Sequence, residues 1–154
     1  MKSVFYVATI VHAYRKAIDA YFADPENYKF NPEWMHELKK VSHREFTTGF
    51  YFDKPTSDTQ IYDSNTYVKN YIYLGTVENC DDRGFAKIEQ KNKFSVGETI
   101  EIMKPDGRNV LAEVRGIYTE EGVSQESAPH PKQVLFIDLS EKADQYDILR
   151  KKED

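Results

Sequence analysis

Short β-prone runs separated by turn residues, with no helical pattern between them, constrain the fold of this chain more than any other feature. The runs cover residues 67–77, 85–91, 99–103, 110–118 and 133–139. The turn signals are Asp81-Asp82-Arg83-Gly84, Ser95-Val96-Gly97, Pro105-Asp106-Gly107 and Glu120-Glu121-Gly122. Short strands at this spacing are typical of a small antiparallel barrel or sandwich. The sequence therefore predicts a mainly β domain in its second part.

The start of the chain carries a different pattern, because apolar residues recur there at three- and four-residue spacing. This spacing predicts an amphipathic helix that begins after Ser3 as N-cap and ends at Asp24-Pro25. Asn31-Pro32-Glu33 supplies a cap, a first-turn proline and a first-turn acid for a second, short helix. An isolated helix is marginally stable, so the apolar face of the first helix needs a partner surface. That face includes Val4, Val7, Val11 and Ile18.

These patterns predict three segments in chain order. Residues 1–55 form a helical segment, residues 56–66 a polar linker, and residues 67–154 a C-terminal β-barrel domain. The expected fold class is α+β, mainly β with N-terminal helices, in which two helices precede a small antiparallel β-barrel. We expect the charged tail at 141–154 to form a short terminal helix.

Charge and cysteine content narrow the class of function. The formal net charge is −5, which disfavours a general electrostatic nucleic-acid binder and leaves room only for a local basic strip. The single cysteine suits a reducing compartment, and no signal-peptide pattern is seen at the start of the chain. No apolar stretch is long enough to span a bilayer. We expect a cytoplasmic chain with neither membrane nor DNA as partner.

The residues that could carry catalysis do not form a recognisable constellation in the sequence. None of the four histidines has a close His or Cys partner of the kind a tight metal site shows, so we expect no metal and no cofactor in this chain. Cys80 precedes Asp81 and Asp82, two acids that raise a thiol pKa and suppress the nucleophilic thiolate. The chain by itself is therefore predicted to be non-catalytic. His43 lies beside Arg44, and either a hydrogen-bonded joint or a functional imidazole explains it.

Basic and aromatic residues alternate around the first two predicted strands. Lys69, Tyr71 and Tyr73 are expected on one face of the first strand, with further lysines in and after the second. Stacking aromatics and phosphate-reaching lysines are what single-stranded RNA binding requires. Tyrosines at period two are equally good strand residues on a half-exposed sheet. The candidate RNA or ligand contacts are Lys69, Tyr71, Tyr73, Lys87, Lys91, Lys93, His43, Arg44 and His130.

Several segments together resemble the C-terminal part of the peptidase family U32 proteins, also called collagenase-like proteases. The segments are MKSVFYVAT at 1–9, AYRKAID at 13–19, VSHREFTTGF at 41–50, QKNKF at 90–94 and APHP at 128–131. In that family such segments follow a large TIM-barrel domain. The resemblance therefore implies the end of that catalytic domain followed by a C-terminal β-barrel domain.

The resemblance also implies a role. Several family members resemble RNA hydroxylation factors, which act on a tRNA wobble uridine or a ribosomal RNA cytidine and imply an iron-sulfur centre. The family's cysteine-rich region has no counterpart in these residues, so the centre would belong to the N-terminal domain. The expected function is an accessory module that assists tRNA recognition, with the U32 N-terminal catalytic domain and tRNA as partners. A peptide- or protein-binding domain of a U32 peptidase and a purely structural domain are the alternatives.

Overall fold

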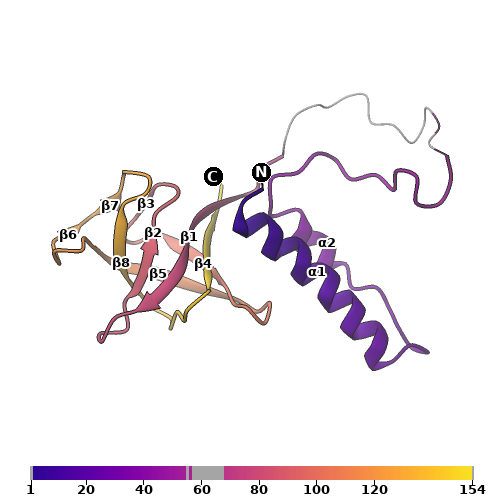
Figure 1. Ribbon diagram of the computed structural model, residues 1–154, viewed down its shortest axis with the longest axis horizontal. Helices are drawn as coiled ribbons and strands as arrows, with labels where there is room; N and C mark the ends of the chain where they lie inside the picture. Colours follow the sequence, from indigo (N-terminus) through magenta and orange to yellow (C-terminus); the bar gives the residue numbers. More distant parts are fainter. Residues whose placement is uncertain (1, 55, 57–67, 154) are drawn as a thin grey trace. The chain divides into compact units, whose positions relative to one another are not determined.

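The computed structural model describes residues 2–54, 56 and 68–153, and the chain divides into two compact units. Unit 1 is Met1–Asn70 and unit 2 is Tyr71–Asp154 (Figure 1). Apart from residue 56, the predicted linker at 56–66 lies outside the described residues. Each unit is therefore considered by itself.

Unit 1 contains the two predicted helices, α1 (Val4–Ala23) and α2 (Glu33–Leu38). The Ser3 hydroxyl accepts a hydrogen bond of 3.1 Å from the backbone N–H of Tyr6, which caps the first turn of α1. The Asn31 side chain accepts one of 2.9 Å from the N–H of Glu33 at the start of α2. Both helices are confirmed, and so are the start of α1 after Ser3 and its end at Asp24. The start of α2 lies one residue later than predicted, with Pro32 rather than Asn31 at the N-cap position.

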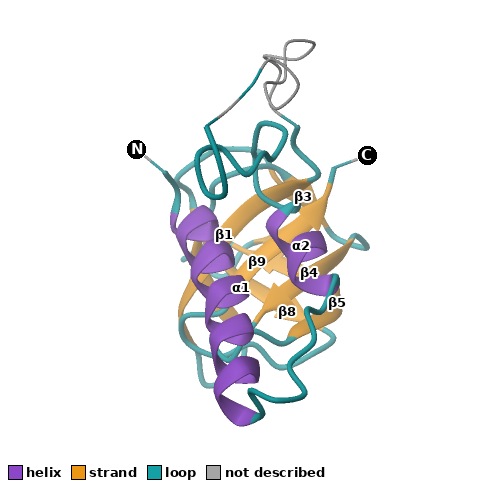
Figure 2. Ribbon diagram, turned by 90° about the vertical axis from the view of Figure 1, so that its right-hand side faces the viewer, coloured by secondary structure: helices purple, strands orange, loops and turns teal. Residues whose placement is uncertain are grey.

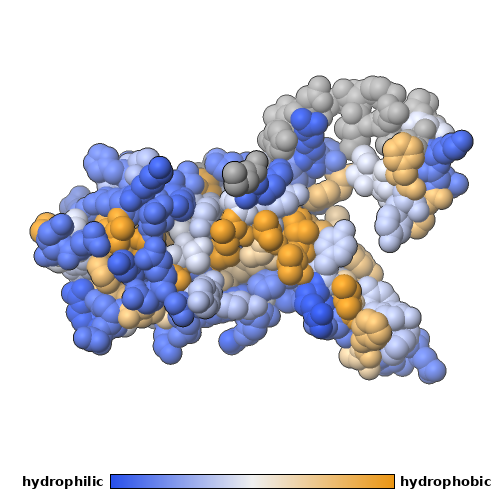
Figure 3. Space-filling view, in the orientation of Figure 1, coloured by the Kyte–Doolittle hydropathy of each residue, from blue (hydrophilic) through white to orange (hydrophobic). Residues whose placement is uncertain are grey.

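The apolar face of α1 remains largely open. The helix buries Phe5, Thr9 and Ala13. The side chains expected to need a partner surface stay exposed, as shown by the exposed fractions of Val4 at 61 %, Val11 at 56 % and Ile18 at 45 %. Apolar residues line the helix in the space-filling view (Figure 3). Contiguous exposed apolar surface is typical of an interaction site.

Unit 2 is built from antiparallel strands that close on themselves (Figure 1, Figure 2). Its strands are β1 (Tyr71–Cys80), β2 (Ala86–Glu89), β3 (Phe94–Ser95), β4 (Thr99–Met103), β5 (Asn109–Tyr118), β6 (Ser124–Gln125), β7 (Ser127–Ala128), β8 (Val134–Leu139) and β9 (Ile148–Lys152). The sheet order is β4-β9-β1-β2-β8-β5-β6, and β4 also pairs with β5. The hydrogen-bonded strands from β4 to β5 thus form a ring, and the prediction of a mainly β second part is confirmed.

Alternate side chains of β2, β5 and β8 fill much of the interior of the ring. On β8, Leu135 and Ile137 are fully buried, whereas Phe136 between them lies on the outer face. Burying each such aliphatic side chain stabilises the fold by roughly 1.5 to 3 kcal/mol. The largest members of this core are Leu74, Ile88, Phe94, Ile100, Ile102, Ile117, Leu135, Ile137 and Leu149.

The end of the chain differs from the prediction of a terminal helix. Residues Ile148–Lys152 form strand β9, which pairs with both β1 and β4. Ile148 and Leu149 are buried, so a segment that looks charged in sequence supplies a central strand of the ring. The first strand also begins later than predicted, at Tyr71, because Val68 pairs with His43 in an isolated bridge.

Candidate functional site

The tyrosines predicted to stack on RNA lie on the outer face of β1 and are half-buried by neighbours in unit 2. The ring of Tyr71 lies 5.4 Å from the guanidinium carbon of Arg150, which is itself fully buried. The Tyr73 hydroxyl is 2.8 Å from the Thr76 hydroxyl. Lys69 precedes the strand and belongs to unit 1, so the three residues do not share one strand face.

The predicted lysines are spread over several elements of unit 2. Lys91 forms an ion pair with Glu89, which raises the pKa of Lys91 and lowers that of Glu89. Lys93 borders a polar pocket of about 510 Å³, whose other lining residues are Ser95, Val96, Glu126 and Ser127. Lys87 lies on β2 with its ammonium 4.0 Å from Glu120. Carboxylates thus lie near Lys87, Lys91 and Lys93, and the role of these lysines as RNA contacts stays a prediction.

His43 has the environment of a structural joint. Its side chain is buried, its Nδ1 lies 2.8 Å from the backbone carbonyl oxygen of Val41, and its ring stacks on Phe46 at a centroid distance of 4.6 Å. These contacts favour a hydrogen-bonded joint over a functional imidazole at His43. Arg44 and His130 are exposed, and their role as ligand contacts stays a prediction.

A basic and aromatic cluster that the sequence analysis missed lies on the outer face of unit 2. The rings of Phe85 and Tyr118 stack at 5.2 Å with an interplanar angle of 15°. The guanidinium carbon of Arg83 is 4.4 Å from the Phe85 ring centroid and 5.7 Å from that of Tyr118. We call Arg83, Phe85 and Tyr118 the Arg83 stack. Cation–π contacts of this kind are weak individually but orient the groups involved.

The turn between β1 and β2 holds Arg83 in place. The Asp81 carboxylate accepts hydrogen bonds of 2.9 Å from the backbone N–H groups of Arg83 and Phe85 and from Arg83 Nε. Burial acts to raise the pKa of Asp81, but these hydrogen bonds outweigh it and hold the pKa below its ordinary value. Gly84 adopts a φ of +84°, which favours glycine at this place in the turn.

A glycine on β5 makes room for the Tyr118 ring. A Cβ added to Gly116 would lie 2.8 Å from Tyr118 Cε2, closer than real Cβ atoms approach other atoms. The ring therefore lies back over the strand only because this residue has no side chain. Cross-strand register then places Phe136 beside Tyr118 and Lys87 beside Phe136, with the Lys87 ammonium 6.0 Å from the Phe136 centroid.

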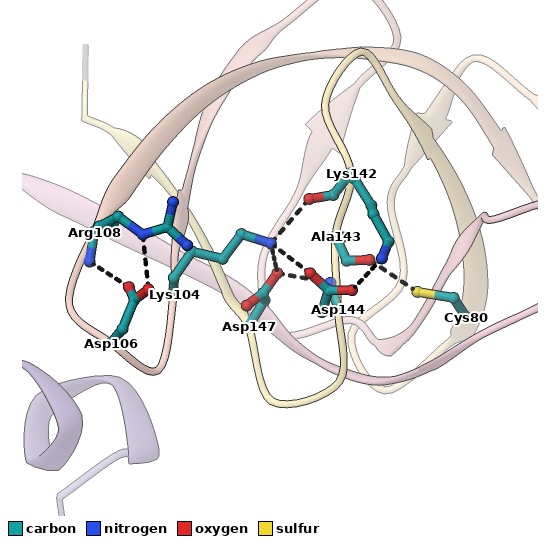
Figure 4. Close-up of polar contacts among 8 residues, drawn as sticks. All are labelled: Cys80, Lys104, Asp106, Arg108, Lys142, Ala143, Asp144 and Asp147. Carbon is teal, nitrogen blue, oxygen red and sulfur yellow. Dashed lines mark hydrogen bonds and ion pairs between the residues drawn. The ribbon is translucent and has the colours of Figure 1, made fainter.

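A second polar cluster joins the end of β4 to the loop before β9 (Figure 4). Lys104 Nζ donates hydrogen bonds to Asp147 at 2.6 Å, to Asp144 at 3.1 Å and to the carbonyl oxygen of Lys142 at 2.9 Å. Burial acts to lower the pKa of Lys104, but its bonds to the two carboxylates outweigh burial and raise it. Lys142 and Lys104 in turn lower the pKa of Asp144. Asp147 is fully buried, and the cluster is a structural clamp.

Cys80 lies at the margin of the same cluster. Its thiol donates to the carbonyl oxygen of Ala143 at 3.2 Å (Figure 4). Burial, followed by the charge of Asp144, raises the pKa of the Cys80 thiol, which disfavours the thiolate needed for nucleophilic attack. Within residues 2–54, 56 and 68–153, no group of three or more His, Cys, Asp or Glu side chains could hold a metal ion.

Unit 1 offers an apolar groove between its helices. The groove has a volume of about 200 Å³ and is lined by Ala13, Tyr14, Ala17, Phe30, Trp34, Met35 and Leu38. The ring centroid of Trp34 lies 5.5 Å from that of Phe30 and 6.3 Å from that of Tyr28. Aromatic packing therefore holds the segment before α2 against that helix. Neither helix among the described residues is long and apolar enough to cross a membrane.

Comparisons with known proteins match both units. The model of peptidase family U32 matches residues 1–61, and that of the peptidase family U32 C-terminal domain matches residues 69–150. The tRNA hydroxylation protein P1 of Bacillus subtilis (strain 168) is 36 % identical over 152 residues, covering 98 % of this chain and 36 % of the relative. The tRNA hydroxylation protein P of Escherichia coli (strain K12) is 33 % identical over 107 residues, covering 69 % of this chain and 23 % of the relative.

A crystal structure of the C-terminal domain of a Geobacillus thermoleovorans protein described as a U32 peptidase covers 52 % of this chain and 99 % of that domain. Its sequence identity is 27 % and its TM-score 0.47.

The fold and the matches define the class of protein first: a mainly β C-terminal module preceded by a helical segment. The chain belongs to peptidase family U32, with residues 69–150 matching the family's C-terminal domain. It spans 36 % of the length of the Bacillus subtilis relative.

Proposed function

We propose that this chain is the C-terminal, non-catalytic part of a tRNA hydroxylation protein, where it helps to hold the tRNA substrate. The observation that carries the proposal is the 36 % identity, over almost the whole chain, to a relative named as a tRNA hydroxylation protein. The redox chemistry of hydroxylation, with an iron-sulfur centre, is assigned in this proposal to the N-terminal catalytic domain. The C-terminal module contributes binding and orientation, which lower the entropic cost of catalysis.

The environment of Cys80 supports a non-catalytic role. Its thiol is hydrogen-bonded to a backbone carbonyl, and its pKa is raised rather than lowered. An activated nucleophile needs an adjacent base or a lowered pKa. The chain is therefore expected to leave gelatin and casein intact. Turnover of either protein by the pure chain that is abolished by Cys80→Ala would contradict this.

Titration of the intact chain with labelled tRNA tests the RNA role. We expect weak binding that becomes weaker as salt rises, because the net charge of −5 opposes binding and only local cations favour it. Duplex DNA of similar length and a collagen-like peptide are the comparison ligands. Absence of tRNA binding at low salt, or tighter binding of the peptide, would contradict the proposal and favour the peptide-binding alternative.

The open face of α1 supports a second, compatible role, docking against the N-terminal catalytic domain of a U32 protein. Residues 1–61 match the U32 family model, and the exposed residues Val4, Val7 and Val11 recur at helical spacing on α1. Association of the chain with the separately purified N-terminal part of the Bacillus subtilis relative tests this role. Val7→Asp should abolish association, whereas Leu111→Asp, on an exposed position of β5, should leave it intact. Equal association of both variants would contradict docking through α1.

A further inference from the structure

We infer that the Arg83 stack is the place where this module holds an unpaired RNA base, with Lys87 reaching an adjacent phosphate. The inference rests on the proposed function and deepens it, because it names the part of the tRNA recognised and the residues that recognise it. These residues differ from the tyrosine and lysine strip expected from the sequence, of which only Lys87 is retained.

The stack presents a flat surface that is already assembled. Phe85 and Tyr118 pack face to face, and the Arg83 guanidinium covers them on one side. The Arg83 side chain is 55 % exposed, so solvent reaches the guanidinium. Unpaired RNA bases stack on aromatic rings and on guanidinium planes of this kind. Because Asp81 already holds the Arg83 side chain, that side chain loses less entropy when a base binds.

The charge pairing of Arg83 favours a base over a phosphate at this position. Asp81 accepts from Arg83 Nε at 2.9 Å and lies 2.7 Å from a terminal guanidinium nitrogen. The Nε side of the guanidinium, one of the edges that would hold a phosphate in a bidentate manner, therefore already faces a carboxylate. The face of the guanidinium remains for stacking.

Lys87 is the neighbouring cation best placed to reach a phosphate. It belongs to the same outer face, and its nearest carboxylate oxygen, on Glu120, is 4.0 Å away, longer than a hydrogen bond. Asp82 and Asp138 also carry negative charge on or next to these elements, which disfavours a long phosphate backbone. The arrangement fits one or two unpaired nucleotides rather than a duplex.

The test is fluorescence anisotropy of the full chain with a labelled single-stranded oligoribonucleotide, its duplex form and tRNA. Arg83→Ala and Tyr118→Leu should each weaken binding of the single strand and of tRNA by at least about fivefold, the lower range for loss of one stacked base. The duplex should bind more weakly than the single strand. Thermal unfolding of each variant shows whether it keeps the native fold.

Arg108→Ala is the matched control. Arg108 donates from Nε to Asp106 at 2.7 Å and from its N–H to the same carboxylate at 2.9 Å, as Arg83 does to Asp81. Its side chain is 73 % exposed, and no aromatic stack on it is found in the described part of the chain. Arg83→Ala and Arg108→Ala each remove one positive charge, so an effect of charge alone would be the same in both variants. Only Arg83→Ala should weaken binding.

The salt dependence separates stacking from charge. Arg83→Ala should leave the slope of log affinity against log salt nearly unchanged, because Asp81 already neutralises the guanidinium. Lys87→Ala should reduce that slope by up to about one unit, as expected for one phosphate contact. Arg83→Lys keeps the positive charge but removes the planar guanidinium on which a base stacks. It should therefore weaken binding as Arg83→Ala does.

The outcomes distinguish this inference from the proposed function. If the wild-type chain binds no RNA even at low salt, the proposed function fails and this inference fails with it. If the wild-type chain binds RNA and the Arg83 and Tyr118 variants bind equally well, the inference alone is overturned. Weakening by Lys91→Ala and Lys93→Ala with no effect of Arg83→Ala would likewise overturn it in favour of those lysines.

Discussion

The two units of the chain use their apolar residues in opposite ways. In unit 2 the strand order closes from β4 to β5, and the large aliphatic side chains are buried inside the ring. In unit 1 the longest helix leaves most of its apolar face exposed. Unit 2 therefore carries its own core, whereas unit 1 presents a surface suited to a partner.

The comparison also separates two kinds of polar residue. The Lys104–Asp147 pair is shielded from water and ties the loop before β9 to the ring. The charges of α1, such as the Arg15–Asp19 pair, are solvated and lie one helical turn apart. Exposed pairs of this kind contribute little to stability, whereas a buried charge that loses its partner is strongly destabilising.

The largest effect is therefore expected from the Lys104 cluster. Lys104→Met leaves the fully buried Asp147 without its cation and should lower the free energy of unfolding of unit 2 by about 3 to 5 kcal/mol. Urea unfolding followed by circular dichroism of the sheet measures this. The double variant Lys104→Met/Asp147→Asn should recover part of the loss. A single variant as stable as the wild type would show that the clamp is not structural.

A cavity in the ring should have the next largest effect. Ile137→Ala removes a fully buried side chain of β8 and should lower the free energy of unfolding by about 2 to 5 kcal/mol. Ile137→Val, which removes less volume, should lower it by about 0.5 to 1.5 kcal/mol. Trp34, the single tryptophan, lies in α2 and reports unit 1 by fluorescence. Circular dichroism of the sheet should shift in these variants, whereas Trp34 fluorescence should not. An equal shift of both signals would mean that the two units do not unfold separately.

Much of this architecture could be predicted from local pattern. The spacing of apolar residues and the caps at Ser3 and Asn31 predicted both helices, because helix signals lie within a few neighbouring residues. Strands β2, β4, β5 and β8 begin within one residue of the predicted position, because turn residues next to each strand mark its start. Strand β9 was missed because charged residues dominate the tail at 141–154, and the burial of the strand depends on pairing with β1 and β4.

The Arg83 stack could not be predicted because it depends on register. Phe85 and Tyr118 are distant in sequence and meet only once β2, β8 and β5 lie side by side. The signal within each strand was present, since Phe85 and Lys87 alternate with buried Ala86. Without the register, the alternating tyrosines of β1 are the more evident platform for stacking RNA bases. In the fold, Tyr71 packs against Arg150.

A smaller effect on the stability of unit 2 is expected when the pH is lowered. The lowered pKa of Asp144 means that its contribution to stability is fully present above the ordinary pKa of 3.8 and is lost as pH falls through the lower, folded value. The urea midpoint of unit 2 should therefore be flat near neutral pH and fall below about pH 4. Asp144→Asn should flatten this acid limb. An unchanged limb in that variant would assign the loss to other carboxylates, such as Asp81 and Asp106.

The smallest effect should come from the same chemical change made on the open face of unit 1. Ile18→Ala removes the side-chain atoms that Ile137→Ala removes, but Ile18 is 45 % exposed and lies in a helix. The loss of partial burial is offset by the higher helix propensity of alanine, so the free energy of unfolding should change by no more than about 0.5 kcal/mol. Trp34 fluorescence during urea unfolding measures it. A loss as large as that of Ile137→Ala would show that the α1 face is already packed in the isolated chain, and the contrast between the two units would then fail.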